Sequence, residues 1–340
     1  MRPAPSRRKI VAPRPDSLDP PEPTRKASTP HRAPSHQTLG WIAVGIAVLG
    51  FSLGSTLVKR ADSPPVMLAF WRMVTTTVVW NALLISTGRR PMWTSIRRGA
   101  VPGILFGLNL TAFFAGVTNN SVANAELIGS LAPFLIVPIG AMLFGEAVNR
   151  RALLFALPAL GGVGLVLFAA PPTGDSSWRG NVFSLLAMLL WAGYVAATRH
   201  FRGPLDVIEF MASILPVATL TVLPFALLNG FSSVSWHGWK YILLLTFVTG
   251  LGAHGMIVFA QRTIGIGSIG VAQVAQPALA AFWSFLILGE PLHRLQLAGM
   301  GLVLTGLLAF ITATQRANRH ALLPAEPTAI SETSVALRNR

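Results

Sequence analysis

The feature that most constrains this chain is an internal repeat with a spacing of 144 residues. Residues 131–168 and 275–312 share one order of features: an apolar segment, a Gly-Glu pair, a short basic turn and a second apolar segment. The identical pairs are Pro133/Pro277, Leu135/Leu279, Gly145/Gly289, Glu146/Glu290, Arg150/Arg294, Leu153/Leu297, Leu160/Leu304 and Gly162/Gly306. Such a duplication predicts one fold built from two related halves.

The composition indicates an integral membrane protein. Of the 340 residues, 52% are hydrophobic and only 11% are charged, whereas soluble domains average about 25% charged residues. The chain has no cysteine, which excludes disulfides, zinc–thiolate sites and iron–sulfur clusters.

The net charge of +15 is concentrated near the N-terminus rather than on a nucleic-acid-binding face. Residues 1–38 are rich in Pro and Ser and hold eight of the basic residues: Arg2, Arg7, Arg8, Lys9, Arg14, Arg25, Lys26 and Arg32. This composition predicts a disordered tail. We expect it to face the anionic lipid of the cytoplasmic leaflet, so membrane lipid is a partner and nucleic acid is not.

Apolar runs after the tail predict ten transmembrane helices in an all-α fold, each near the ~20 residues that cross a bilayer. Their expected ranges are 39–58, 65–86, 100–117, 121–145, 151–170, 181–200, 206–229, 239–261, 265–289 and 295–314. The corresponding domains are a tail at 1–38, a first five-helix repeat at 39–170, a linker loop at 171–180, a second repeat at 181–314 and a C-terminal tail at 315–340.

Basic residues in the connections predict the orientation. With both termini cytoplasmic, nine fall in inner loops and five in outer loops. The inner set is Arg89, Arg90, Arg97, Arg98, Arg150, Arg151, Arg199, Arg202 and Arg262, and the outer set is Lys59, Arg60, Arg179, Lys240 and Arg294. The positive-inside rule therefore favours cytoplasmic termini. Because each half has an odd number of helices, the two repeats are inverted relative to each other.

The paired Pro and Gly-Glu segments resemble the EamA-type family of the drug/metabolite transporter superfamily. The run Ala69-Phe70-Trp71-Arg72 also resembles that family's arginine-bearing second helix, whereas the second half has Ala212 at this place. The resemblance covers residues 39–314. It implies two five-helix halves and transport of small solutes, including amino acids, metabolites and drugs, often outward.

Ionisable residues within predicted spans are candidate functional groups because their burial in a membrane is costly. Glu126 is the one acid clearly inside a predicted span, and it either binds a proton or a substrate amine or reaches water near the outer interface. The second half has Gly270 at the matching position. Arg72 either pairs with a substrate carboxylate or with Glu126, or its side chain extends to the headgroups.

Other polar and aromatic residues also fall within predicted spans. His254 either transfers protons or forms a hydrogen bond between helices. Gln273 and Gln276 share a helix face just before Pro277 and either contact substrate or join helices. Trp191 and Tyr194 share a face that suits apolar or cationic substrates, although tryptophan more often marks a membrane interface.

The repeated motif residues predict a structural or gating role, since they break or end helices. They are Pro133, Gly145, Glu146, Pro277, Gly289 and Glu290. The sequence has no phosphate-binding P-loop and no metal-ligand spacing such as HExxH, so we expect no catalytic residues, metal or cofactor.

The sequence therefore predicts a secondary transporter in the plasma (inner) membrane that exports a small metabolite by alternating access. Protons or a solute gradient would drive it. One alternative is a passive facilitator or channel. Another is an intramembrane lipid-modifying enzyme, which would need clustered acid, base or metal residues that the sequence lacks. The pattern does not indicate an oligomeric state.

Overall fold

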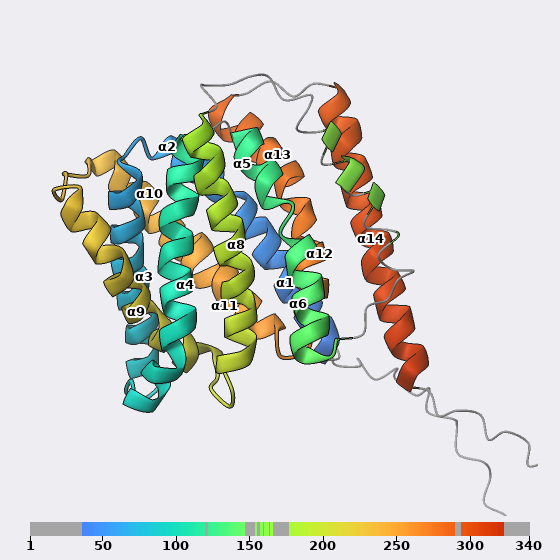
Figure 1. The fold of residues 1–340 in the computed structure, drawn as a ribbon, viewed down its shortest axis with the longest axis horizontal. Coiled ribbons are helices and arrows are strands. Elements are labelled where there is room, and N and C mark those ends of the chain that lie inside the picture. Colours follow the sequence, from blue (N-terminus) through green and yellow to red (C-terminus); the bar gives the residue numbers. More distant parts are fainter. Residues whose placement is uncertain are drawn as a thin grey trace, which may run out of the picture. The chain divides into compact units, whose positions relative to one another are not determined.

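The structure is a computed structural model that describes residues 36–119, 122–146, 177–289 and 294–322, with a few residues between 154 and 165. Within these ranges the chain is helical and contains no strand (Figure 1). Most of the predicted helix 151–170, most of the linker 171–180, Glu290 and the tail up to residue 35 lie outside the described residues.

The first half contributes six described helices. They are α1 (His36–Ser52), α2 (Gly54–Arg60), α3 (Pro65–Ser86), α4 (Trp93–Thr118), α5 (Val122–Gly129) and α6 (Pro133–Phe144). Helix α3 begins directly after Pro64, with Pro65 in its first turn. Proline suits that place because its missing N–H has no partner there in any case.

The second half contributes the remaining described helices. They are α8 (Trp178–Phe201), α9 (Val207–Leu228), α10 (Trp236–Leu245), the π-helix η1 (Thr246–Ala253), α11 (His254–Ala260), α12 (Ile266–Ala272), the 3₁₀ turn η2 (Gln273–Ala275), α13 (Gln276–Leu288) and α14 (Arg294–Leu322). Helix α14 continues past the predicted end at residue 314.

Seven described helical segments are long and apolar enough to cross a membrane, which makes the chain a multi-pass membrane protein. They are His36–Arg60, Pro65–Ser86, Trp93–Thr118, Trp178–Phe201, Val207–Leu228, Trp236–Ala260 and Ile266–Leu288. Two shorter apolar helices cover Pro133–Phe144 and Leu297–Phe310.

The repeated prolines mark the places where two predicted helices are interrupted. The segment 121–145 divides into α5 and α6, with a turn at residues 130–132 before Pro133. The segment 265–289 divides into α12 and α13, with η2 before Pro277. Proline cannot donate to the i−4 carbonyl and its ring crowds the preceding turn, so each α-helix restarts there.

The repeated glycines end the second part of each interrupted helix. Gly145 follows α6 with φ +61°, and Gly289 follows α13 with φ +72°. This left-handed conformation is strained for residues that carry a Cβ, so glycine is the residue expected at both places.

Helix α4 packs closely against α9 through glycine. A Cβ added at Gly103 would lie 2.6 Å from the backbone oxygen of Ile214, and one at Gly107 would lie 2.7 Å from that of Ala218. Small residues let membrane helices approach and gain dispersion energy where no hydrophobic effect drives their association. The same helix packs against α8, which carries Trp191.

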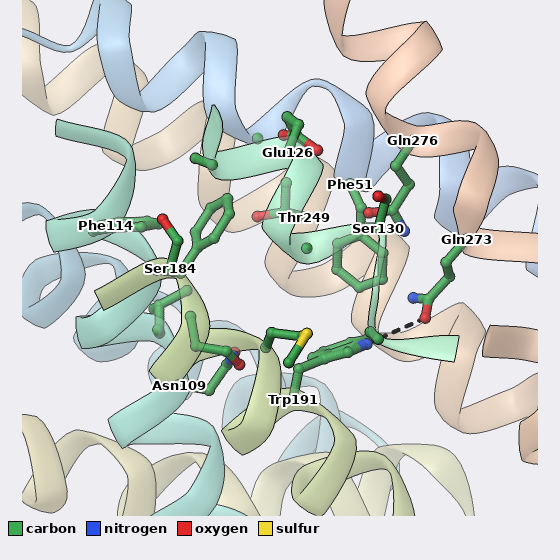
Figure 2. Close-up of a pocket in the computed structure, with 18 of the residues that line it drawn as sticks. Phe51, Asn109, Phe114, Glu126, Ser130, Ser184, Trp191, Thr249, Gln273 and Gln276 are labelled. Atoms are coloured by element: carbon green, nitrogen blue, oxygen red, sulfur yellow. Dashed lines mark hydrogen bonds between the residues drawn. The ribbon is translucent and has the colours of Figure 1, made fainter. Parts of the chain in front are cut away.

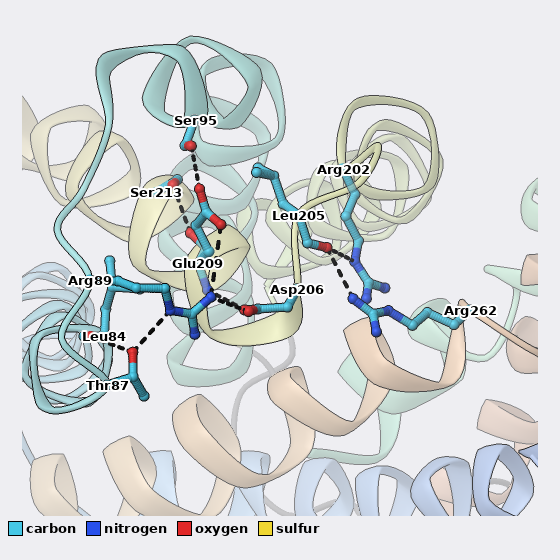
Figure 3. A network of polar contacts seen from close by, with 10 residues as sticks. All are labelled: Leu84, Thr87, Arg89, Ser95, Arg202, Leu205, Asp206, Glu209, Ser213 and Arg262. Atoms are coloured by element: carbon cyan, nitrogen blue, oxygen red, sulfur yellow. Dashed lines mark hydrogen bonds and ion pairs between the residues drawn. The ribbon is translucent and has the colours of Figure 1, made fainter.

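A polar network joins the connections at one end of the helices (Figure 3). Arg89 forms an ion pair with Asp206, which also caps α9 by accepting a hydrogen bond from the Glu209 N–H at 2.9 Å. Arg202 and Arg262 both donate to the backbone oxygen of Leu205, each at 3.2 Å. Three basic connections predicted to lie on the inner side are therefore next to one another.

Candidate functional site

A cavity of about 140 Å³ lies among helices from both halves of the chain (Figure 2). On this measure a single water needs about 10–15 Å³, so the cavity has room for a small organic molecule. Its polar or charged lining residues are Arg72, Asn109, Glu126, Ser130, Ser184, Thr249, His254, Gln273 and Gln276. Aromatic and aliphatic side chains such as Phe51, Phe114 and Met188 form much of the remaining wall.

Arg72 lies in the wall of the cavity and is almost completely buried, with 1% of its surface exposed. Its Nη2 donates to the hydroxyl of Thr249 at 2.6 Å, whereas Nε and Nη1 have no hydrogen-bond partner among the described residues. The guanidinium also lies 5.8 Å from the ring centroid of Phe114. The guanidinium is thus held in place and keeps donors to spare.

The π-helix η1 positions the partner of Arg72. The hydroxyl of Thr249 donates to the Leu245 backbone oxygen at 2.7 Å and accepts from Arg72. On the same face, Thr246 lies 2.6 Å from the hydroxyl of Thr75, and Trp80 donates to Gly250. A π-helical turn often marks a functional site, because it displaces side chains from their ordinary helical register.

Glu126 lines the cavity from α5 and is half-buried. Its carboxyl group lies beside the Ser55 hydroxyl of α2, without a hydrogen bond of ordinary geometry. No ion pair joins it to Arg72, since the ion pairs found among the described residues are those of Arg89 with Asp206 and Glu209. The cavity therefore presents two opposite charges that do not neutralise each other by direct contact.

Further predicted site residues meet on one side of the cavity. Trp191 donates from its indole N–H to the side-chain oxygen of Gln273 at 3.1 Å, which links α8 to η2. Gln276 lies one turn further along, and Pro277 follows it in the cavity lining. His254 is 4% exposed and lies in an aromatic cluster, with its ring centroid 4.7 Å from that of Phe51.

Tyr194 lies behind this cluster rather than in the cavity lining. It is fully buried and stacks on Phe106 with ring centroids 4.9 Å apart. Its ring also lies 5.4 Å from that of Trp191, so it supports the cavity wall from outside.

Sequence reasoning did not single out several polar residues of the lining. Asn109 is buried in α4 and donates to the Ala187 backbone oxygen at 2.8 Å. An amide in an apolar span is a signal that could have identified it. Ser184 and Thr249 carry no comparable signal, because hydroxyl residues are common in membrane helices and often bond their own backbone.

The motif residue Glu146 joins the two halves at the end of α6. Its two carboxylate oxygens accept the backbone N–H groups of Ile266 at 2.8 Å and Gly267 at 3.1 Å, in the first turn of α12. Negative charge at a helix start is favourable because the first N–H groups lack helical partners. Pro133 and Pro277 line the cavity, so the two helix breaks border it.

The described residues hold no group of three or more His, Asp or Glu side chains that could bind a metal ion. The polar groups of the cavity suit hydrogen bonding and charge pairing with a solute.

The sequence profile of the EamA-like transporter family matches residues 38–168 and again residues 178–312. This chain belongs to that family. It is accordingly a membrane transporter rather than an enzyme.

Several curated proteins are similar to this family member. The pseudopaline exporter CntI of Pseudomonas aeruginosa PAO1 is 23% identical over 275 residues, which cover 79% of this chain and 95% of the relative. The uncharacterized protein PA1977 of the same strain is 29% identical over 270 residues, or 76% and 89% of the two chains. The riboflavin transporter of Brucella anthropi is 26% identical over 164 residues, which cover 46% of this chain and 55% of the relative.

A solved crystal structure shares the fold. It matches 82% of this chain and 98% of its own length, with a TM-score of 0.67 and 21% identity.

Proposed function

We propose that this EamA-like transporter exports a small metabolite, such as an amino acid, a related compound or a drug, across the plasma (inner) membrane by alternating access. The main support for this proposal is the cavity, which is lined by polar and charged groups from both halves of the chain. A site between two repeats, bordered by interrupted helices, is a recurrent arrangement in carriers. The relatives named as a pseudopaline exporter and a riboflavin transporter support a small organic solute.

We further propose ten transmembrane helices in two inverted five-helix repeats, with domains at 39–170 and 181–314 joined by a linker at 171–180. The family profile matches twice, over ranges close to these domains. The tails at 1–38 and 315–340 would lie outside the membrane.

The sorting of connections at the two ends of the helices supports this topology. Arg89, Leu205 and Arg262 lie together at one end through the network around Asp206 (Figure 3). Other connections meet elsewhere: His237 lies 3.0 Å from the backbone oxygen of Arg60, and Ser177 donates to that of Asn119 at 2.7 Å. Alternate connections thus lie at the same end of the helices, as expected for a chain that crosses the membrane repeatedly. The end that holds the basic connections around Asp206 would be cytoplasmic, together with both termini.

The two interrupted helices supply a mechanism for alternating access. Under the 144-residue repeat, α5 corresponds to α12 and α6 to α13. Helix α6 packs along α12, where a Cβ at Gly270 would lie 3.1 Å from Ile136, while the matching contact of α13 with α5 is less extensive. We propose that transport exchanges these contacts, so that α13 closes on α5 while α6 separates from α12.

Glu126 is suited to couple this exchange to occupancy. Under the 144-residue repeat, Glu126 corresponds to Gly270, which packs against Ile136 in the contact of α12 with α6. The residue that corresponds to Ile136 is Ala280 on α13. Closing α13 onto α5 would therefore press the carboxylate against a helix. Because a lone buried charge is costly, closure favours Glu126 neutralised by a proton or by a substrate amine.

The other candidate residues take supporting roles in this proposal. The solute would contact four residues of the cavity wall: Arg72, Gln273, Gln276 and Trp191. The aromatic side of the cavity would be shaped by His254 and Tyr194. The repeated motif residues would control opening at the ends of the interrupted helices. Membrane lipid surrounds the helices, and the cytoplasmic basic segments face its anionic headgroups.

The test is a comparison of small metabolites in the medium of cells that overproduce the chain and of cells that lack it. We expect one or a few compounds to accumulate outside the producing cells. Equal profiles at confirmed membrane abundance would contradict export. For an exported compound, counterflow of labelled solute into vesicles loaded with unlabelled solute separates a carrier from a passive channel, since a channel does not show it.

A further inference from the structure

On the basis of the proposed function, we infer that the solute is a small amino-carboxylate, whose carboxylate binds Arg72 and whose ammonium group binds Glu126. This assigns the substrate class of the cavity from the two charged groups that line it.

The state of Arg72 carries the first half of the inference. Its guanidinium is buried, forms one side-chain hydrogen bond to Thr249 and leaves Nε and Nη1 without partners among the described residues. No described carboxylate pairs with it. A buried guanidinium without an anion is expensive, and its planar array of donors matches a carboxylate in geometry and charge. A substrate carboxylate would accept hydrogen bonds from the free donors of Arg72 and neutralise its charge.

The residues around Arg72 prepare it for this role. Thr249 fixes Nη2 at 2.6 Å, and the ring of Phe114 lies against the guanidinium at 5.8 Å. A charged group that is held before the ligand arrives loses little side-chain entropy on binding, which strengthens the contact.

Glu126 carries the second half of the inference. It is the carboxylate among the described lining residues, and it does not form an ion pair with Arg72. A zwitterion that spans the two groups neutralises both charges and adds none of its own to the cavity. An anion alone would leave Glu126 to be neutralised by a proton, and an amine alone would leave Arg72 uncompensated.

The charge balance also separates a carboxylate from a phosphate. A phosphate monoester carries about −1.5 to −2 charges at neutral pH. Arg72 is the permanent cation among the described lining residues, so a singly charged carboxylate matches it and a phosphate does not. The aromatic walls around Phe51 and Trp191 then suit an apolar side chain of the solute.

The test uses the purified full-length chain in proteoliposomes. They are loaded with an equimolar mixture of the twenty proteinogenic amino acids and their carboxamides, which lack only the charged carboxylate. Release is measured by mass spectrometry against protein-free vesicles. We expect at least one amino acid to leave about tenfold or more faster than its carboxamide, because the neutral carboxamide cannot form the charge-assisted pair with Arg72.

The variants separate recognition from a structural role. Arg72→Gln should reduce the ratio of amino-acid to carboxamide release to about 1, and Arg72→Lys should leave an intermediate ratio because it keeps the charge without the planar donors. Thr249→Val, which removes only the hydroxyl that orients Arg72, should lower the ratio while leaving a folded protein. Arg179→Gln makes the same chemical change at an exposed arginine outside the cavity lining and should keep the wild-type ratio.

The outcomes are distinct. A wild-type protein that releases carboxamides as fast as amino acids, or a ratio unchanged in Arg72→Gln, overturns the inference. Release of neither class overturns it as well. In that case, chain-dependent export of other compounds by cells would keep the proposed transport function, and its absence would remove that too.

Discussion

Glu146 and Ile266 are joined by a hydrogen bond of 2.8 Å, in which a carboxylate oxygen at the end of α6 accepts the backbone N–H that begins α12. The carboxylate fits tightly, since an added Cβ at Gly265 would lie 2.6 Å from it and one at Gly140 would lie 2.8 Å away. One residue of the repeated Gly-Glu motif thus connects the two halves. Under the proposed mechanism, that end of the transporter would open at this contact.

Removing this charge should open the α6–α12 contact. Glu146→Gln keeps the shape but replaces one acceptor by an NH₂ group that cannot accept an N–H. A cysteine introduced at Val137, which packs against Gly267 in the same contact, should then react with N-ethylmaleimide about tenfold faster, from a loss of ~1–2 kcal/mol. A cysteine at the exposed Ser232 provides the control. Equal rates of N-ethylmaleimide reaction at position 137 with and without Glu146 would show that Glu146 does not hold α6 against α12.

Glu126 should link transport to a proton or to the charge of the substrate. Glu126→Gln keeps the shape and abolishes titration. We expect this variant to lose gradient-driven accumulation and its pH dependence. Uphill transport with an unchanged pH profile would instead show that Glu126 does not couple transport.

Asp206 should stabilise the protein in a pH-dependent way. Partial burial acts to raise its pKa, but hydrogen bonds from the Glu209 backbone and Arg89 outweigh this effect, so the pKa of Asp206 is lowered. The stabilisation is therefore present above the ordinary pKa of 3.8 and is lost as the pH falls through the lower, folded-state value.

Two substitutions test this sign. Asp206→Ala removes the cap of α9 and should cost about 0.5–2 kcal/mol at pH 7. Asp206→Asn retains a capping oxygen and should cost less, and its deficit should shrink as the pH falls below 3.8 and the wild-type carboxylate also becomes protonated. Thermal unfolding of the purified protein measures both, and a deficit of Asp206→Asn that grows on acidification would contradict the account.

The proposed orientation predicts which residues an impermeant thiol reagent reaches. The chain has no cysteine, so single cysteines report alone. A cysteine at Thr94, exposed at the start of α4, should react only after cells are permeabilised. One at Ser232, in the connection before α10, should react in intact cells. Labelling of position 94 from outside would exclude cytoplasmic termini with ten helices.

The N-terminal tail should be dispensable for transport. Residues 1–38 contain too few large apolar side chains to form a core. Deleting residues 2–34 should leave the transport rate per molecule nearly unchanged. A large loss of rate at equal membrane abundance would show that the tail takes part.

The sequence was most informative where one residue type has one physical consequence. Pro133 and Pro277 predicted places where helical hydrogen bonding is interrupted, because proline lacks an N–H donor. Gly145 and Gly289 predicted helix ends, because glycine accepts a positive φ. Charge in an apolar span directed attention to Arg72 and Glu126, both of which line the cavity.

Features that depend on packing between distant segments could not be predicted in this way. The π-helical turn that brings Thr249 to Arg72 has no local sequence signal, and neither does the position of Tyr194 behind Trp191. The contact of Glu146 with the start of α12 joins residues 120 positions apart. Only the three-dimensional arrangement shows such partners.

The central claim is that solute passes through the cavity, and filling the cavity tests it most directly. Gly129 lines it and has no atom within 4 Å of an added Cβ, so a side chain can begin there in open space, and Gly129→Trp is expected to fill part of the cavity. Gly45 on α1 is equally open but lies outside the lining, and Gly45→Trp is the matched control. At equal membrane abundance, export of the chain-dependent metabolites should fall to background in Gly129→Trp and stay at the wild-type rate in Gly45→Trp. Wild-type export by Gly129→Trp would contradict the account.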